Sequence, residues 1–87
     1  MVKLERVIKA LANRRRLAIV AYLKTKKEAP VWEIADHIGL SFKATSKHLG
    51  VLAAVDIVER EQRSLEKMFY HLEKPQPEGA KQILPLL

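Results

Sequence analysis

Cysteine is absent from this chain of 87 residues. Without it the protein can form no disulfide scaffold, no thiolate metal site and no cysteine nucleophile. The same absence fits a reducing cytoplasm, where we expect the protein to act. Long hydrophobic runs are also missing, since the longest, Leu17–Leu23, has seven residues and is followed by lysines. A run of that length cannot cross a bilayer, so no membrane segment is expected.

Acidic and aromatic residues are both scarce. Ten Asp and Glu stand against sixteen Lys and Arg, which gives a net charge of +6 at pH 7. The first 27 residues carry nine of these basic residues and a single glutamate, a net +8, and the other sixty sum to −2. This excess favours a polyanionic partner such as nucleic acid. The aromatic content of 6% argues against an RNA or single-strand binder, because such proteins stack bases on aromatic side chains.

What remains is the composition of a small globular domain. Hydrophobic residues make up 48% and charged residues 30% of the chain, which is enough apolar surface to offset the entropy of folding. A chain this short has room for one core and is only marginally stable alone, which favours a partner subunit.

Apolar residues recur at helical spacing in four segments. Asn13 and Ser41 precede two of them and are favourable N-caps, and Gly39 can end the third in a left-handed conformation. Three arginines at the start of the second segment lie beside the positive end of a helix dipole, at a cost of about 0.3–1 kcal/mol per charge. The polar stretch Thr25–Ala29, ended by Pro30, is expected to be a connector. The predicted helices are Val2–Ala12, Arg14–Lys24, Val31–Ile38 and a last one from Ser41 to about Val55.

Charged residues alternate with β-branched and aromatic ones after Asp56, which predicts two strands, Ile57–Arg63 and Met68–Glu73. In this hairpin one alternating set lies against another, namely Val58, Arg60 and Gln62 against Met68, Tyr70 and Leu72. The two preceding helices are joined by a tight turn and have the form of a helix-turn-helix. The predicted fold is therefore mainly α (α+β), a winged helix-turn-helix of four helices followed by a two-stranded β-hairpin wing. It occupies residues 1–73, and the Pro-containing C-terminal tail, residues 74–87, is expected to be irregular.

Five blocks in this order resemble the ArsR-type (arsenical-resistance repressor) family of winged helix-turn-helix transcriptional regulators. The blocks are Ala10–Leu17, Glu33–Ala35, Ile38–Ser41, Ser46–Leu49 with Val51-Leu52, and Ile57-Val58 with Phe69–Leu72. The resemblance implies a homodimer that binds a palindromic DNA operator and is released by a metal or another signal. The family's thiolate metal motif falls at Pro30 and Trp32, neither of which can donate a ligand, so we expect no metal sensing and no cofactor. The family's long C-terminal helix is replaced by the tail.

The helix beginning at Ser41 is the predicted recognition helix. Its residues Thr45, Leu49 and Leu52 form a core stripe, and the opposite face must meet water or the major groove. Phe42 touches a thymine methyl or packs under the wing, and His48 is expected to hydrogen-bond backbone or phosphate. The predicted DNA-binding residues are Ser41, Phe42, Lys43, Ser46, Lys47, His48, Arg63, Lys67 and Arg14.

Other basic and aromatic residues have structural alternatives. Either Arg15 or Arg16 is expected to brace the fold rather than contact phosphate. Arg60 can pair within the hairpin, and Trp32 is interpreted as a core or dimer-edge residue. Leucines and an isoleucine near the end of the tail, together with the apolar stripe of the first helix, predict dimerisation.

The three histidines do not indicate a metal site or catalysis. None of His37, His48 and His71 has another ligand type at zinc-binding spacing. Ser46 and His48 lie two residues apart, so on a helix their side chains point about 200° apart and cannot form a nucleophile–base pair. We therefore expect no enzyme.

The sequence predicts a cytoplasmic, homodimeric, sequence-specific double-stranded DNA-binding regulator, a repressor without metal sensing. The alternative is a winged-helix interaction module that holds an acidic partner protein. The two differ in salt dependence, because counterion release from duplex DNA gives a slope of about −0.9 in log K against log[salt] per phosphate neutralised.

Overall fold

The computed structural model describes all of residues 1–87 and contains the predicted helices and hairpin. The helix bounds agree with the prediction to within one residue except at the end of the second helix. The elements are, in order, α1 (Val2–Leu11), α2 (Arg14–Lys26), β1 (Glu28–Pro30), α3 (Val31–Ile38), α4 (Phe42–Ala54), β2 (Val58–Ser64), β3 (Lys67–Leu72), α5 (Ala80–Ile83) and a 3-10 turn η1 (Leu84–Leu86).

The predicted caps form. The Asn13 side chain accepts hydrogen bonds from the backbone N–H groups of Arg15 and Arg16, at 2.9 and 3.1 Å. Ser41 Oγ accepts from the Ala44 N–H at 3.1 Å. Gly39 ends α3 with φ of 70°, a conformation that costs a glycine little, and the short turn that follows aligns α4 against α3.

The sheet has three strands in the order β1-β3-β2, all antiparallel, where the sequence predicted two. The hairpin register agrees with the expected facing sets, since Val58 lies opposite Leu72 and Arg60 opposite Tyr70. The interpretation of Thr25–Ala29 as a connector was wrong. The helix α2 continues to Lys26, Lys27 turns the chain with φ of 76°, and Glu28–Pro30 pairs with β3 as an edge strand. Three residues are too few to show an alternating pattern, so only tertiary pairing reveals this strand.

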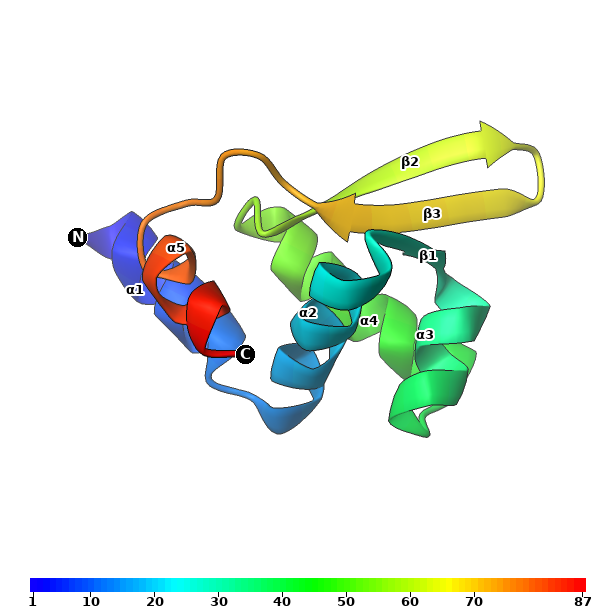
Figure 1. The fold of residues 1–87 in the computed structure, drawn as a ribbon, viewed down its shortest axis with the longest axis horizontal. Coiled ribbons are helices and arrows are strands. Elements are labelled where there is room, and N and C mark those ends of the chain that lie inside the picture. The colour runs from blue at the N-terminus through cyan, green and yellow to red at the C-terminus, as the bar shows by residue number, and fades with distance from the viewer.

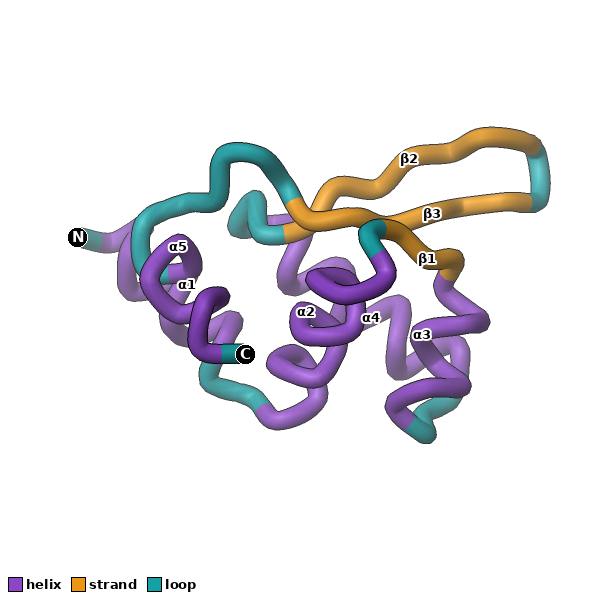
Figure 2. The backbone as a smooth tube through the Cα atoms, in the orientation of Figure 1, coloured by secondary structure: helices purple, strands orange, loops and turns teal.

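A single core of seventeen buried residues lies between the helices and the base of the sheet. The helix α2 supplies its centre through Ile19, Val20 and Leu23, each at most 1% exposed. Figure 1 shows the helices below the sheet and the β2–β3 hairpin extending well beyond them, and Figure 2 shows β1 at the point where the chain enters α3. The tip of the hairpin therefore extends past the helices.

The C-terminal segment is not irregular, and that expectation was wrong for residues 80–86. It folds back along α1 (Figure 1), where Ala80 and Leu84 join the core. Gly79, with φ of 94°, passes so close to α1 that a Cβ atom there would lie 2.9 Å from Leu4. Lys24 Nζ donates to the backbone carbonyls of Leu84 and Leu87, at 3.0 and 3.2 Å. The prolines do not prevent this packing, because Pro85 stands in the first turn of η1, where its missing N–H has no role. No helix of the structure combines the length and the apolar character needed to cross a membrane.

Candidate nucleic-acid interface

The helix α4 divides into a buried and an exposed face, as the sequence predicted. Thr45, Leu49 and Leu52 are fully buried, and Thr45 Oγ1 satisfies its polar group by donating to the Ser41 carbonyl at 2.8 Å. On the other face Lys43 and Lys47 are exposed and make no ion pair. Four further residues complete this surface. Three are exposed and one is half-buried: Ser41, Phe42 and Gly50, and Ser46. The core therefore fixes the orientation of the helix and leaves a polar, basic face open.

His48 does not belong to that open face. It is half-buried, and its Nδ1 lies 3.2 Å from Arg16 Nη1 rather than bonding backbone. A guanidinium has only donors, so Nδ1 accepts and the ring proton of the neutral form is on Nε2. Burial, and then the positive charge of Arg16, hold the pKa of His48 below its usual range. The imidazole is consequently a neutral bridge between α4 and α2.

The three arginines at the start of α2 separate into two kinds. Arg16 is half-buried and its Nε donates to the Ala10 carbonyl at 2.6 Å, which closes the last turn of α1. This confirms that one of Arg15 and Arg16 braces the fold. Arg14 and Arg15 are exposed, and neither side chain makes a hydrogen bond or ion pair. They are free to meet an anion.

On the wing, Arg63 is engaged with the protein itself. It pairs with Glu28 on β1 and Glu61 on β2, and its guanidinium carbon lies 4.4 Å from the centre of the Phe69 ring. Lys67, at the hairpin turn, is exposed and unpaired. The sequence assigned a contact to DNA to both. The structure leaves Lys67 available and places Arg63 in an intramolecular cluster.

Arg60 shows the opposite outcome. The sequence allowed it to pair within the sheet, yet it is exposed and forms no ion pair. The signal that could have identified it is the alternation of the strand, because Arg60 shares the face of Val58, which has no acidic residue, whereas Arg63 shares the face of Glu61.

Two large aromatic side chains stand exposed at the starts of α3 and α4. Trp32 at the start of α3 and Phe42 at the start of α4 are 66% and 61% exposed, so Trp32 is not a core residue. Both line a cleft of about 190 Å³ between the helices and the wing, with Lys67 and Met68 on its far wall. Phe42 thus does not pack closely under the wing.

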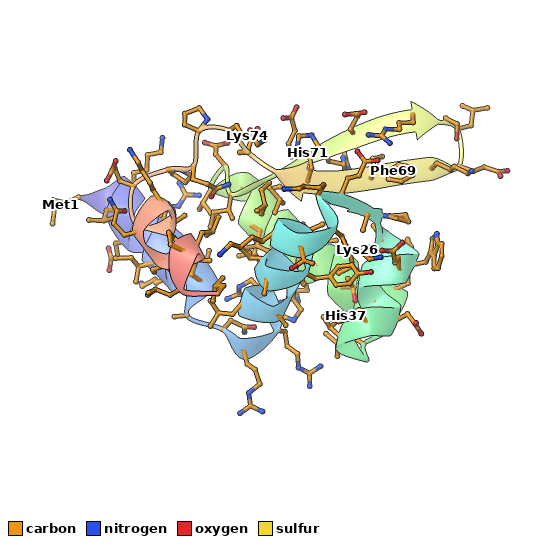
Figure 3. All side chains as sticks on the ribbon, in the orientation of Figure 1. Met1, Lys26, His37, Phe69, His71 and Lys74 are labelled. Carbon is orange, nitrogen blue, oxygen red and sulfur yellow. The ribbon has the colours of Figure 1, made fainter.

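The histidines gather no metal-ligand set. The structure contains no group of three His, Asp or Glu side chains placed to hold a metal ion. His37 stacks on the Tyr22 ring, with centroids 4.1 Å apart. The Tyr22 hydroxyl in turn donates to Glu33, and this bond raises the pKa of Tyr22 to about 12. These contacts join α2 to α3 (His37 is labelled in Figure 3) and so hold the helix-turn-helix against the core.

Comparisons with known proteins agree with this geometry. A family model described as a helix-turn-helix domain matches residues 11–61. HlyU from Vibrio cholerae is 31% identical with a TM-score of 0.81, and the match covers 99% of this chain and 85% of HlyU. The homodimeric winged helix-turn-helix DNA-binding domain of Mb0332 from Mycobacterium bovis, a possible ArsR-family transcriptional regulator, is 30% identical (TM-score 0.79, 98% and 74% covered). The transcriptional repressor BigR from Xylella fastidiosa is 31% identical (TM-score 0.76, 95% and 80% covered). No match was found among curated proteins.

Proposed function

The chain belongs to the ArsR family of winged helix-turn-helix transcriptional regulators, a family of DNA-binding proteins rather than enzymes, and on that premise we propose that it is a homodimeric repressor that recognises a specific duplex sequence. The observation that carries the proposal is the face of α4 on which Lys43 and Lys47 are exposed and unpaired while the opposite face is locked in the core. A major groove admits a helix presented in this way.

Within this interface the side chains have different tasks. Lys43, Ser46 and Lys47 lie on the exposed face of α4 and are assigned to base edges or to the adjacent phosphates. Ser41 retains a hydroxyl proton for a phosphate, because its oxygen is the acceptor in the N-cap. Arg14 is assigned to the backbone, where it positions the protein without reading sequence. His48 supports α4 through Arg16 and is not assigned a base.

The homodimer is supported by apolar surface that a monomer would leave in water. Val2, Ile8 and Leu86 are 72%, 46% and 81% exposed, and they lie on α1 and on the η1 turn of the segment packed against it. Mb0332 is described as homodimeric, and a two-fold dimer would present two recognition helices to the two halves of a palindrome.

Repression is supported by the similarity to BigR and requires only that the bound dimer occupies its site. We place the protein in the cytoplasm, where its DNA would be. Metal is not the proposed signal, because the chain has no cysteine and the positions of the family's thiolate motif hold Pro30 and Trp32. Zinc, copper and arsenite at low micromolar concentration should leave DNA affinity unchanged in a gel-shift titration.

The test of sequence recognition is selection of bound fragments from random duplex DNA, followed by a salt titration on the enriched site. We expect one palindromic site and a steep negative slope of log K against log[salt]. Lys47→Ala should lower affinity for that site by the value of one base contact, about 1–3 kcal/mol, and for random duplex by less. Lys26→Ala, an exposed lysine on α2 with the same charge change, is the control and should leave selectivity unchanged. No enriched site and a flat salt slope would favour the acidic protein partner and contradict the proposal.

A further inference from the structure

The wing carries an ion cluster that spans all three strands of the sheet. Arg63 Nη1 and Nη2 donate to the two carboxylate oxygens of Glu28 at 2.5 and 2.6 Å, and Nε donates to Glu61 at 2.8 Å. The guanidinium also lies over the face of Phe69 on β3, which is labelled in Figure 3. One side chain on β2 thus contacts the middle strand and the far edge strand.

A shift in register accompanies this cluster. The hairpin pairing moves by one residue between Gln62 and Ser64, so Arg63 has no residue opposite it on β3. Such a bulge bends the strand and re-aims the side chain at the extra position. Glu28 stands 35 residues earlier in the chain, on the strand that leads directly into α3. The cluster therefore connects the hairpin to the start of the helix-turn-helix.

The geometry of the cluster distinguishes it from an ordinary surface ion pair. Exposed pairs contribute little unless they are bidentate or part of a network, and this one is both. The Arg63 side chain is 39% exposed and Glu28 40%, so water screens it only partly. The hydrogen bonds from Arg63 lower the pKa of Glu28, which keeps its carboxylate charged and the cluster intact. Three of the five N–H donors of this guanidinium are bonded to carboxylates, so a bidentate contact with a phosphate would compete with at least one of them.

Arg60 lies on the same strand but on the other face of the sheet. Tyr70 lies opposite Arg60 on β3. The Tyr70 and Val58 side chains pack into the core over α4. Arg60 is the next residue along that face toward the hairpin tip, and it is exposed and without an ion pair. It extends from the side of the sheet on which the recognition helix lies.

We propose that the two wing arginines have separate roles: Arg63 is a positioning residue that fixes the hairpin to the helix-turn-helix, and Arg60 is the wing arginine that meets the DNA backbone. This rests on the proposed function, since it names how the same interface is oriented and which charge completes it. Preorganisation explains the benefit, because a hairpin already held in place loses less freedom when it binds.

Matched substitutions test the two roles, first in the free protein. Arg63→Gln and Arg60→Gln remove the same charge from the same strand. We expect faster amide exchange in residues 61–69 for Arg63→Gln and no change for Arg60→Gln. Equal exchange in the two variants would overturn the positioning role whether or not the protein binds DNA.

DNA binding then separates a contact from a positioning effect. Arg60→Gln should flatten the slope of log K against log[salt] by about 0.9, the value of one phosphate. Arg63→Gln should lower affinity about 3- to 10-fold at every salt concentration with the slope unchanged, because it loosens the wing without removing a contact. A slope that falls for Arg63→Gln and not for Arg60→Gln would reverse the assignment and refute it.

Glu28→Gln gives the sharpest comparison, because charge and geometry predict opposite signs. Removing a negative charge should by itself strengthen binding to DNA, whereas releasing Arg63 from its partner should weaken binding. We expect weaker binding, and tighter binding would overturn the proposal. If the unaltered protein binds no duplex at all, the proposed function and the role of Arg60 both fail, and amide exchange alone decides the role of Arg63.

Discussion

Replacing Arg16 by alanine should be among the most damaging single changes outside the apolar core. Its Nε–H donates to the Ala10 carbonyl at 2.6 Å and its Nη1 to His48 at 3.2 Å, so it joins α1, α2 and α4. Ala10 is 3% exposed. Its carbonyl lies in the last turn of α1, where the helix can offer no partner of its own, and water has little access to replace the guanidinium.

The magnitude follows from those two bonds. A hydrogen bond from a charged donor contributes about 1.5–3 kcal/mol to stability. We take this range to include the cost of leaving the buried Ala10 carbonyl without a donor. The bond to His48 is longer and adds less. We expect a loss of about 2–3 kcal/mol in the free energy of unfolding, from a total of about 5–15 for a domain. For a chain of this length that corresponds to a fall in Tm of roughly 10–20 °C.

Urea and thermal unfolding followed by far-ultraviolet circular dichroism would measure this loss, at one fixed protomer concentration because the proposed dimer would contribute to stability. Arg15→Ala is the control, since it removes the same side chain one residue earlier from an exposed position with no partner. It should change stability by no more than about 0.5 kcal/mol. If Arg16→Ala fell within that same range, or if both variants were equally unstable, the bracing role assigned to Arg16 would be refuted.

Three further outcomes follow from named side chains. Acidification below about pH 6.5 should lower the free energy of unfolding. The pKa of His48 is lowered in the folded protein, so the unfolded chain takes up a proton there that the folded protein does not. His48→Gln should make the free energy of unfolding depend less on pH in unfolding titrations. Leu86→Glu should shift sedimentation from a dimer of two 9.9 kDa chains toward the monomer, and an unchanged dimer would remove η1 from the interface. If Phe42 touches a thymine methyl, Phe42→Ala and replacement of thymine by uracil in the selected site should each weaken binding. In the Phe42→Ala variant, the uracil replacement should then weaken binding no further.

Local chemistry accounts for the parts of the fold that the sequence predicted. Asn13, Gly39 and Ser41 determine where helices begin and end through bonds to residues two to four positions away, and the structure shows these caps. The exposed face of α4 follows from the helical period once the core stripe is recognised. The facing sets of the hairpin follow in the same way from the two-residue period of a strand, as the pairing of Arg60 with Tyr70 shows.

Tertiary contacts account for what the sequence left out. The strand β1 exists because Glu28–Pro30 lies beside β3, more than forty residues along the chain at Ala29 and Tyr70, and three residues carry no period of their own. The C-terminal segment is ordered because Gly79 allows its backbone to approach Leu4 at the other end of the chain. The role of Arg63 depends on Glu28 in the same way. Proline content and local charge, on which the predictions for these segments relied, do not reveal contacts with residues so far away in the sequence.

The arginine run at the start of α2 shows why the availability of a charge is a tertiary property. Each of the three bears the cost of lying near the positive end of a helix dipole, about 0.3–1 kcal/mol at the surface. For Arg16 the Ala10 carbonyl, at the negative end of α1, offsets that cost within the fold. Arg14 and Arg15 have no such compensation, since neither side chain finds an acceptor in the protein. Their charges gain a favourable partner only from outside the chain, and a line of phosphates beside the exposed face of α4 would supply one to each.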